Sequence, residues 1–278
     1  MKLTVLVDNS TIIDSYFLGE PGVSFFLEDG ETSVLFDTGY SDAFMRNAAK
    51  LNVDPLRADY LVLSHGHIDH TGGLDPLLKE CLERRLKDRS AHCPELLAHP
   101  AVFTPKLMEG LGSIGMSMSR QACSSVMKIK ESAAPVRLSE RLIFLGEIER
   151  KFDFESPAAI GSRKEPGGEV PDYLPDDTAL AYVSDEGLVV ITGCSHSGIC
   201  SIVEQARRLT GVERVRDIIG GFHLLEPSEK QLEGTAEYLS TLQLPVLSAC
   251  HCTDLQSKLR LSRAAPLKEV GSGMEIYY

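Results

Sequence analysis

Three histidines and an aspartate lie within one turn of this chain, directly after the apolar run YLVL, in the segment SHGHIDHTGG (residues 64–73, the histidine-rich turn). The chain has only 8 histidines in 278 residues, so His65, His67 and His70 together indicate a shared role. Residues two apart in an extended turn point the same way, so His65 and His67 can bind one ion. Asp69 and His70 come next and can reach a second ion a few Å away. A fold for this chain must therefore bring this turn to a place where further ligands can meet it.

Three more histidines follow apolar runs that are typical of strands. His196 comes after LVVITG, His223 after RDIIGG and His251 after LPVLSA. In α/β sheets, ligand sites lie beyond the carboxyl ends of the strands, where separate loops converge. The sequence therefore predicts that these three side chains meet the histidine-rich turn in space. We expect ordinary structural roles for His92 and His99, which lie in an irregular segment that contains proline.

Strand-like apolar runs alternate with amphipathic, helix-like runs along most of the chain. We expect strands at 2–7, 24–29, 33–39, 59–64, 188–193, 215–221 and 244–250. A hairpin turn at Asp29–Gly30 should join the second and third of them. We expect helices at 42–51 (capped by Ser41 or Asp42), 75–87 (capped by Asp75), 201–210 and 228–242. This alternation predicts an α/β fold in which helices cover sheet layers.

Two segments lack this periodicity. Residues 104–125 are rich in Gly, Ser and Met, and residues 155–177 are rich in Pro, Gly and acidic residues. Both are predicted to be long loops within a single domain that spans 1–278. The first contains GLGSIG (110–115), which matches the dinucleotide-binding pattern G-x-G-x-x-G. No buried strand precedes it, so we interpret it as a flexible loop.

The charge and the cysteine spacing limit the kinds of partner and the cell compartment. The formal net charge of −12 argues against nucleic acid or an anionic membrane as a partner and leaves a small-molecule substrate. No apolar run is long enough to span a bilayer, and the N-terminal run is too short for a signal peptide. The seven cysteines lack the paired spacing of a disulfide framework. We therefore expect a cytoplasmic protein, and the sequence leaves its oligomeric state open.

The pattern H-x-H-x-D-H after an apolar strand resembles the signature of the metallo-β-lactamase superfamily. The segment LFDTG (35–39) is similar to the strand and turn that precede this signature in the family. The resemblance implies a four-layer αβ/βα sandwich over essentially the whole chain, with a two-metal site at one edge of the sheets. GCSHSGI (193–199), GGFHL (220–224) and HCT (251–253) resemble the branch of the family named for a dihydropterin ribofuranosylaminobenzene phosphate synthase. DNS (8–10) is similar to that branch as well.

The chain departs from the family pattern on both sides of one strand. In most of the superfamily a third histidine precedes a strand, and an aspartate that bridges both metals follows that strand. Here Asp176 and Asp177 stand where the histidine would fall, and Cys194 and His196 stand in place of the bridging aspartate. Asp177 is therefore a candidate reserve ligand or substrate contact. Without the bridging carboxylate, equal binding of two ions is in question.

The resemblance implies two sets of metal ligands. The first set is His65, His67 and His196. The second set is Asp69, His70 and His251. The expected cofactors are two divalent ions, zinc in the first place with manganese or iron as alternatives, because imidazole mixed with carboxylate suits all three.

The remaining candidate residues have roles that the sequence leaves open. His223 either ligates a metal or stands beside it as a proton donor or substrate contact, since imidazole titrates near neutral pH. Together with Asp69 it is our candidate catalytic residue. Cys194 is a candidate substrate contact, and as a nucleophile it would need a base in the right geometry. Cys250 and Cys252 flank the last histidine, and we interpret both as packing residues.

These expectations lead to a function. We expect a metal-dependent hydrolase or transferase that uses a metal-bound hydroxide or a metal-polarised phosphate on a small phosphorylated substrate, such as a pterin-like or nucleotide-like one. The alternative within enzymes is hydrolysis of a carbon ester, lactone or thioester by the same hydroxide. The alternative outside enzymes is a metal-dependent metabolite sensor with negligible turnover.

Overall fold

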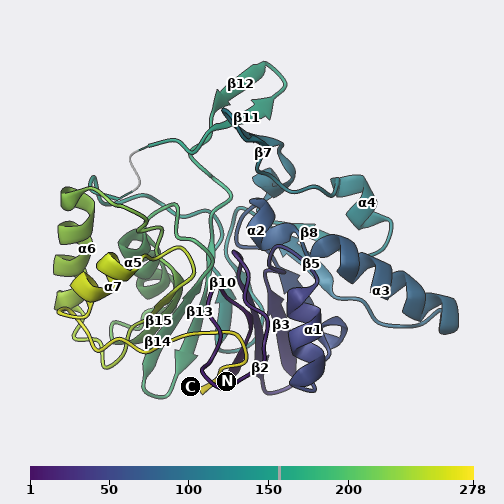
Figure 1. Cartoon of the computed structure of the whole chain (residues 1–278), viewed down its shortest axis with the longest axis horizontal. Helices are drawn as coiled ribbons and strands as arrows, with labels where there is room; N and C mark the ends of the chain where they lie inside the picture. Colours follow the sequence, from purple (N-terminus) through teal and green to yellow (C-terminus); the bar gives the residue numbers. More distant parts are fainter. Residues whose placement is uncertain (156–157) are drawn as a thin grey trace.

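The computed structural model describes residues 1–155 and 158–278, and it has four layers. Figure 1 shows two β-sheets face to face in the middle, with α1 and α3 outside one sheet and α5, α6 and α7 outside the other. The predicted αβ/βα sandwich is therefore confirmed. Both chain ends lie at the edge of the sandwich away from α2 (Ile68–Thr71), the short helix in the histidine-rich turn.

The first sheet has seven strands in the order β17-β1-β2-β3-β4-β5-β8. Their bounds are β1 Lys2–Val7, β2 Ser24–Asp29, β3 Thr32–Phe36, β4 Tyr60–Val62, β5 Glu95–Ala98, β8 Ile129–Glu131 and β17 Glu275–Tyr277. β2 and β3 form the predicted hairpin, in which Asp29 pairs with Thr32. β3, β4 and β5 run parallel, so β4 delivers the histidine-rich turn to one edge of the sheet. The helices α1 (Ala43–Lys50) and α3 (Leu74–Lys87) pack on its outer face.

The second sheet has six strands in the order β16-β15-β14-β13-β10-β9. Their bounds are β9 Val136–Arg137, β10 Leu142–Phe144, β13 Ala179–Ser184, β14 Gly187–Thr192, β15 Val215–Gly221 and β16 Ser248–Cys250. β14, β15 and β16 run parallel, so the residues that follow them gather at one edge. The outer face is covered by α5 (Ile199–Thr210), α6 (Glu229–Thr241) and α7 (Leu255–Leu261).

Apolar side chains from both sheets form the core between them. Phe25 and Phe36 stack at a centroid distance of 6.4 Å, and both are fully buried. From the second sheet, Leu180 and Ile191 are fully buried in the same cluster. Each such side chain stabilises the fold by about 1.5–3 kcal/mol through burial. This packing holds the two sheets so that the residues after β4 and those after β14, β15 and β16 face one another.

The two segments predicted as loops contain short strands. These are β6 (Lys106–Met108), β7 (Gly112–Ser113), β11 (Ser162–Glu165) and β12 (Gly168–Pro171), which pair in the order β12-β11-β6-β7. They form the projecting sheet, which stands above the sandwich in Figure 1. It contacts the histidine-rich turn, where the Ile68 amide donates to the Ile114 carbonyl at 2.9 Å. Residues 156–157, within the second predicted loop, lie outside the described residues.

The GLGSIG segment lies at the tip of the β6–β7 hairpin. Gly110 and Gly112 have φ values of 80° and 85°, which are left-handed conformations that favour glycine. An antiparallel hairpin differs from the strand–turn–helix unit that a dinucleotide site requires. The structure therefore argues against a dinucleotide site, but the interpretation of the whole segment as a loop is wrong for Gly112–Ser113, which form β7.

The helices begin close to where the sequence predicts. α3 begins at Leu74 with Gly73 as its N-cap, so the prediction of Asp75 as the cap is wrong. Asp75 lies in the first helical turn instead, where a carboxylate interacts favourably with the helix dipole. α1 has Asp42 as its N-cap residue, while the Ser41 hydroxyl accepts from the Ala43 amide at 3.1 Å. Among the described residues, every helix is too short or too polar to cross a bilayer.

Candidate metal centre

The histidine-rich turn is an extended segment followed by one turn of helix. His67 has φ −73° and ψ 151°, and α2 then carries Asp69 and His70. A Cβ atom at Gly66 would collide with the Val102 carbonyl, and one at Gly72 with the Tyr40 carbonyl. The two glycines are therefore needed because neighbouring backbone passes so close.

Three imidazoles converge in the first part of the site. His65 Nε2 lies 3.1 Å from His67 Nδ1 and 3.2 Å from His196 Nε2. Ligand atoms about 2.0–2.3 Å from a tetrahedral zinc ion stand about 3.3–3.8 Å from one another. Both spacings are close to that value, so His65 lies relative to His67, and relative to His196, as two ligands of one ion would.

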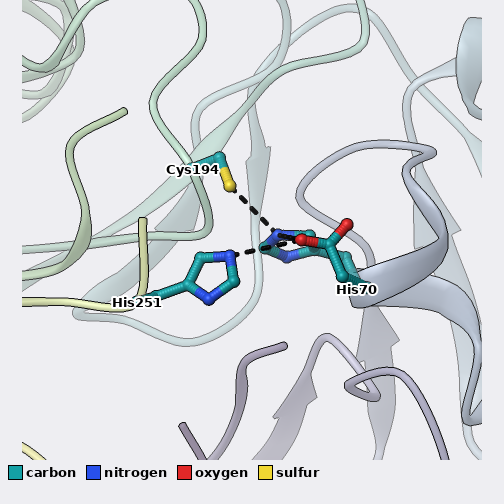
Figure 2. Close-up of side chains that lie close together, drawn as sticks. His70, Cys194 and His251 are labelled. Atoms are coloured by element: carbon teal, nitrogen blue, oxygen red, sulfur yellow. Dashed lines mark hydrogen bonds and ion pairs between the residues drawn. The ribbon is translucent and has the colours of Figure 1, made fainter. Parts of the chain in front are cut away.

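A second group lies next to the first. Asp69 Oδ2 is 3.6 Å from His70 Nε2 and 3.4 Å from His251 Nε2. The Cys194 thiol lies 3.2 Å from His70 Nε2. Figure 2 shows the Cys194, His70 and His251 side chains turned toward one another. The structure thus brings together residues that come from β4, β14 and β16, as the strand-end positions predict.

Among the described residues, two compact groups could hold a metal ion, and Cys194 belongs to both. One is Asp69, His70, Cys194 and His251, and the other is His65, Cys194 and His196. Within each group the ligand atoms all lie within 4.8 Å of one another. His67 is outside both groups, although its Nδ1 is close to His65.

The residues present fit a divalent ion. His251 Nε2 is buried with no hydrogen-bond partner among the described residues. A buried polar atom without a partner is unfavourable unless something binds it. The donor set is imidazole, thiol and carboxylate, which suits zinc better than the harder manganese.

Two carboxylates and an amide that the sequence analysis did not single out fix the ligating rings. Asp37 Oδ2 lies 2.7 Å from His70 Nδ1. The Asn9 side-chain oxygen lies 2.8 Å from His251 Nδ1, and Asp8 accepts from the His251 amide at 3.0 Å. Such contacts set the orientation and tautomer of a ligating histidine. The segments LFDTG and DNS contained these residues, but only as marks of resemblance.

A buried lysine supports the turn from the projecting sheet. The Lys106 ammonium is fully buried, 3.0 Å from Asp172 and 2.8 Å from Asp176. Asp176 in turn accepts from the Gly66 amide at 2.7 Å, between the first two histidines of the turn. This chain of contacts holds the backbone of the turn in place. Nothing in the local sequence around Lys106 indicated it.

Asp177 occupies a different place from the one expected of a substrate contact. Its carboxylate accepts from the Ser197 amide at 2.8 Å and also from the Ser197 hydroxyl. Burial raises the pKa of Asp177 to about 6. It lines a separate cavity together with Arg150 and Tyr173. Its role in the structure is to hold the loop that carries His196.

The cysteines that flank His251 differ from each other. Cys250 packs in the core between the sheets, as predicted. Cys252 does not only pack, because it lines the cavity beside the metal groups and accepts from the His223 amide at 3.2 Å. The prediction that both cysteines only pack is therefore wrong for Cys252. The cause is the turn that follows β16, in which His251 has φ 48°.

His92 and His99 make local contacts outside the two groups. His92 Nε2 lies 2.8 Å from the Ala58 carbonyl, and His99 Nδ1 accepts from the Ala101 amide at 3.2 Å. Both have the structural roles that we expected.

A cavity of about 280 Å³ lies beside the metal groups. Its polar residues are His67, Asp69, Cys194, His196, His223 and Cys252. Its apolar residues are Ile68, Met108, Leu111, Ile114, Ile160 and Leu225. The β6–β7 hairpin supplies much of this apolar part, so the projecting sheet helps to shape the site.

Burial and neighbouring charges shift the pKa values of the site when no ion is bound. Burial lowers the pKa of His67 to about 3. Burial also lowers the pKa of His70, but the carboxylates of Asp69 and Asp37 outweigh it and raise that pKa to about 9. Burial raises the pKa of Asp69, but the neighbouring imidazoles of His70, His251 and His67 together outweigh it and hold the pKa well below its usual range.

We expect His67→Gln to weaken the pH dependence of folding in metal-free protein. His67 has a pKa of about 3 when folded and about 6.5 when unfolded, so the unfolded chain binds the extra proton between these values. The folded state therefore loses stability as the pH falls from about 6.5 toward 3. The difference in unfolding free energy between pH 7 and pH 5 should be about 2 kcal/mol smaller in the variant. Urea denaturation with a chelator present measures it, with His92→Gln as control, and equal differences in the wild type and His67→Gln would contradict the prediction.

Comparisons with known proteins agree with this architecture. Residues 18–209 match the family model described as "Metallo-beta-lactamase superfamily". A protein of Methanocaldococcus jannaschii named 7,8-dihydropterin-6-methyl-4-(beta-D-ribofuranosyl)-aminobenzene-5'-phosphate synthase is 31% identical over 272 residues. That match covers 93% of this chain and 89% of the relative.

Two solved structures share the fold. The crystal structure of Tm1679, described as a metal-dependent hydrolase of the beta-lactamase superfamily, has a TM-score of 0.83 and 27% identity, and the match covers 100% of this chain and 99% of that one. Zn²⁺-bound PqqB from Methylobacterium extorquens has a TM-score of 0.57 and 12% identity, with 100% of both chains covered. At that identity the second likeness concerns the fold alone.

Proposed function

Because this chain belongs to the metallo-beta-lactamase superfamily, we propose that it is a metal-dependent enzyme acting on a small phosphorylated molecule that carries an apolar ring. The name of its Methanocaldococcus jannaschii relative contains both a dihydropterin and a 5'-phosphate. A substrate of the same chemical class would suit this chain, with a metal-assisted displacement at the phosphate or at a pyrophosphate next to the ring system.

The cavity beside the metal groups is the observation that carries this proposal. Half of its lining residues are apolar and can cover the faces of a flat ring. No Lys or Arg occurs among its described lining residues. An anionic group of the substrate would therefore be held at the metal groups, at the histidine-lined end of the cavity.

The residues of the two compact groups would hold the ions, together with His67, which lies outside both groups but beside His65. We propose zinc, with His65, His67 and His196 on one ion and Asp69, His70 and His251 on the other. Bound there, divalent ions would supply Lewis-acid chemistry, polarising a phosphoryl oxygen and neutralising the charge that develops as the bond to the leaving group breaks. Asp37 and Asn9 would keep the ligating nitrogens aimed at the site by hydrogen bonds to the far side of the rings.

His223 is placed to move a proton. Its ring lies 4.2 Å from that of His196, and its Nδ1 is buried with no hydrogen-bond partner among the described residues. Burial lowers the pKa of His223, but the hydrogen bond and charge of Cys252 outweigh burial and raise it. We propose that His223 donates a proton from Nδ1 to the leaving group.

We expect zinc-loaded protein to turn over aryl and pterin-like phosphates faster than small phosphates, because only the ring-bearing substrates use the apolar wall. Leu111→Ser should raise KM for the ring-bearing substrates by about tenfold, the effect of losing about 1.4 kcal/mol of apolar contact. It should leave KM for a small alkyl phosphate unchanged. Steady-state kinetics on a panel of phosphomonoesters, phosphodiesters, lactones and thioesters, with zinc, manganese or iron, measures both effects.

Other results on the same panel would replace this proposal. Faster turnover of a lactone or thioester than of any phosphate would identify a carbon-ester hydrolase. Tight binding of a pterin-like phosphate by fully metallated protein, with no product formed, would identify a metabolite sensor. Tyr40→Ser, which changes an exposed residue outside this cavity, serves as the control for Leu111→Ser.

A further inference from the structure

We propose that the Cys194 thiolate bridges the two metal ions, in the position that an aspartate holds in most relatives. This inference depends on the metal centre proposed above but not on its substrate. It assigns to Cys194 a ligand role in place of the substrate contact expected from the sequence.

The thiol lies where the two ligand groups meet. Cys194 is the one residue common to both groups among the described residues. Its Sγ is 3.2 Å from His70 Nε2, which belongs to the second group. It also lies within 4.8 Å of the ligand nitrogens of His65 and His196 in the first. A single sulfur atom in this position can contact an ion on either side.

The backbone on both sides of Cys194 fixes the position of its sulfur atom. Cys194 follows β14 and is 3% exposed. A Cβ at Gly193 would collide with the Ser64 hydroxyl, so only glycine lets the two turns approach so closely. The next residue, Ser195, has φ 60°, and its hydroxyl donates to the Gly221 carbonyl at 2.7 Å. The sulfur is therefore fixed between the end of β14 and the histidine-rich turn.

The other nearby thiol has a different environment. Cys252 lines the same cavity but belongs to neither ligand group. Its Sγ lies 3.5 Å from the Cys194 carbonyl and accepts from the His223 amide. Cys252 is therefore a matched control, since it is a buried thiol in the same cavity without the ligand position.

A bridging thiolate has a consequence for the choice of metal. Thiolate is a soft ligand that favours zinc and cobalt over manganese and magnesium. Coordination replaces the S–H bond with bonds from sulfur to the ions, and the proton leaves to solvent. We therefore expect the chain to prefer zinc and cobalt over manganese more strongly than a variant with a carboxylate at residue 194.

Cobalt spectroscopy tests the bridge without using activity. Metal-free protein is titrated with Co(II), and absorption is followed in the visible d–d bands and in the near-ultraviolet sulfur-to-cobalt charge-transfer band. We expect the charge-transfer band to grow with the first equivalent and again with the second, because both ions share the sulfur. Cys194→Ser and Cys194→Asp should lose this band, and Cys252→Ser should keep it. Cys194→Asp should still bind two equivalents, with a higher relative affinity for manganese.

The outcomes separate this inference from the proposed function. Two equivalents of Co(II) bound with no charge-transfer band would overturn the bridge and leave the metal centre intact. A band that grows only with one equivalent would overturn bridging and make Cys194 a ligand of one ion. A charge-transfer band that is lost in Cys252→Ser and kept in Cys194→Asp would show that Cys252, and not Cys194, binds the ions. Failure of the unmodified chain to bind Co(II) at all would overturn the metal centre itself.

Discussion

We expect His70→Ala to lower kcat/KM by about a thousandfold, because it removes a proposed metal ligand that lies between two carboxylates. His70 Nε2 belongs to the group with Asp69 and Cys194, and His70 Nδ1 is 2.7 Å from Asp37. The charge stabilisation that a bound ion supplies is several kcal/mol, and about 4 kcal/mol corresponds to a thousandfold in rate. Elemental analysis should show one divalent ion fewer per chain. The measurement is steady-state kinetics on the phosphorylated substrate that the panel identifies.

Two further variants serve as an intermediate case and a control for His70→Ala. Asp37→Asn keeps the ligand but weakens the contact that orients it, so we expect a loss of about 10–100-fold in metal affinity or activity. His92→Ala removes an imidazole that contacts only the Ala58 carbonyl, and should leave both metal content and turnover unchanged. If His70→Ala retained both ions and near-normal turnover, His70 would not be a ligand.

The placement of the histidines shows why the general location of the site could be predicted. Apolar runs such as LVVITG are long enough to be recognised as buried strands, and β14, β15 and β16 are indeed parallel neighbours. Residues just after parallel strands gather at one edge of a sheet whatever lies between them in the sequence. His196, His223 and His251 therefore had to come close together.

The projecting sheet could not be predicted, for a physical reason. Its strands have only two to four residues, and most of their side chains are exposed, so no apolar periodicity marks them. Leu107 pairs with Ser162, a contact between distant segments that only the folded chain creates. For the same reason the sequence could not predict the part of the cavity wall that this sheet supplies.

The sequence also could not predict the contacts that hold the candidate metal-binding residues in place. A fully buried lysine such as Lys106 is rare, and the sequence alone predicts exposure. The tertiary fold overrides this preference by placing two carboxylates beside it. The resemblance implies that Cys194 and His196 stand in place of a bridging aspartate, but only the position of Cys194 between the two groups indicates a ligand role.

We expect Lys106→Met to lower the unfolding free energy of the metal-free protein by about 3–5 kcal/mol. The substitution keeps the length of the side chain but leaves the buried carboxylates of Asp172 and Asp176 without their ammonium partner. Removing one member of a buried ion pair is costly because the remaining charge stays desolvated. Arg163, 3.4 Å from Asp172, can compensate only part of this loss. Urea denaturation followed by circular dichroism gives the free energy.

The same substitution should weaken metal binding through the backbone of the histidine-rich turn. Asp176 accepts from the Gly66 amide, and without Lys106 its carboxylate is no longer held in place, so the backbone between His65 and His67 is less firmly fixed. We expect the zinc affinity to fall by about 10–100-fold, the usual effect of removing a contact behind a ligand.

Two companion variants decide whether the buried charge is the cause. Lys79→Met removes an exposed lysine that is 2.6 Å from Asp75, and should change stability by less than about 0.5 kcal/mol. Adding Asp172→Asn and Asp176→Asn to Lys106→Met removes the unpaired charges and should restore much of the stability, because a neutral buried set carries a smaller desolvation penalty. It should also restore part of the zinc affinity, since an asparagine oxygen can still accept from the Gly66 amide. Two outcomes would contradict charge pairing as the reason why Lys106 matters. One is a Lys106→Met protein with the same unfolding free energy as Lys79→Met. The other is a triple variant with a lower unfolding free energy than Lys106→Met alone, which would indicate side-chain packing instead.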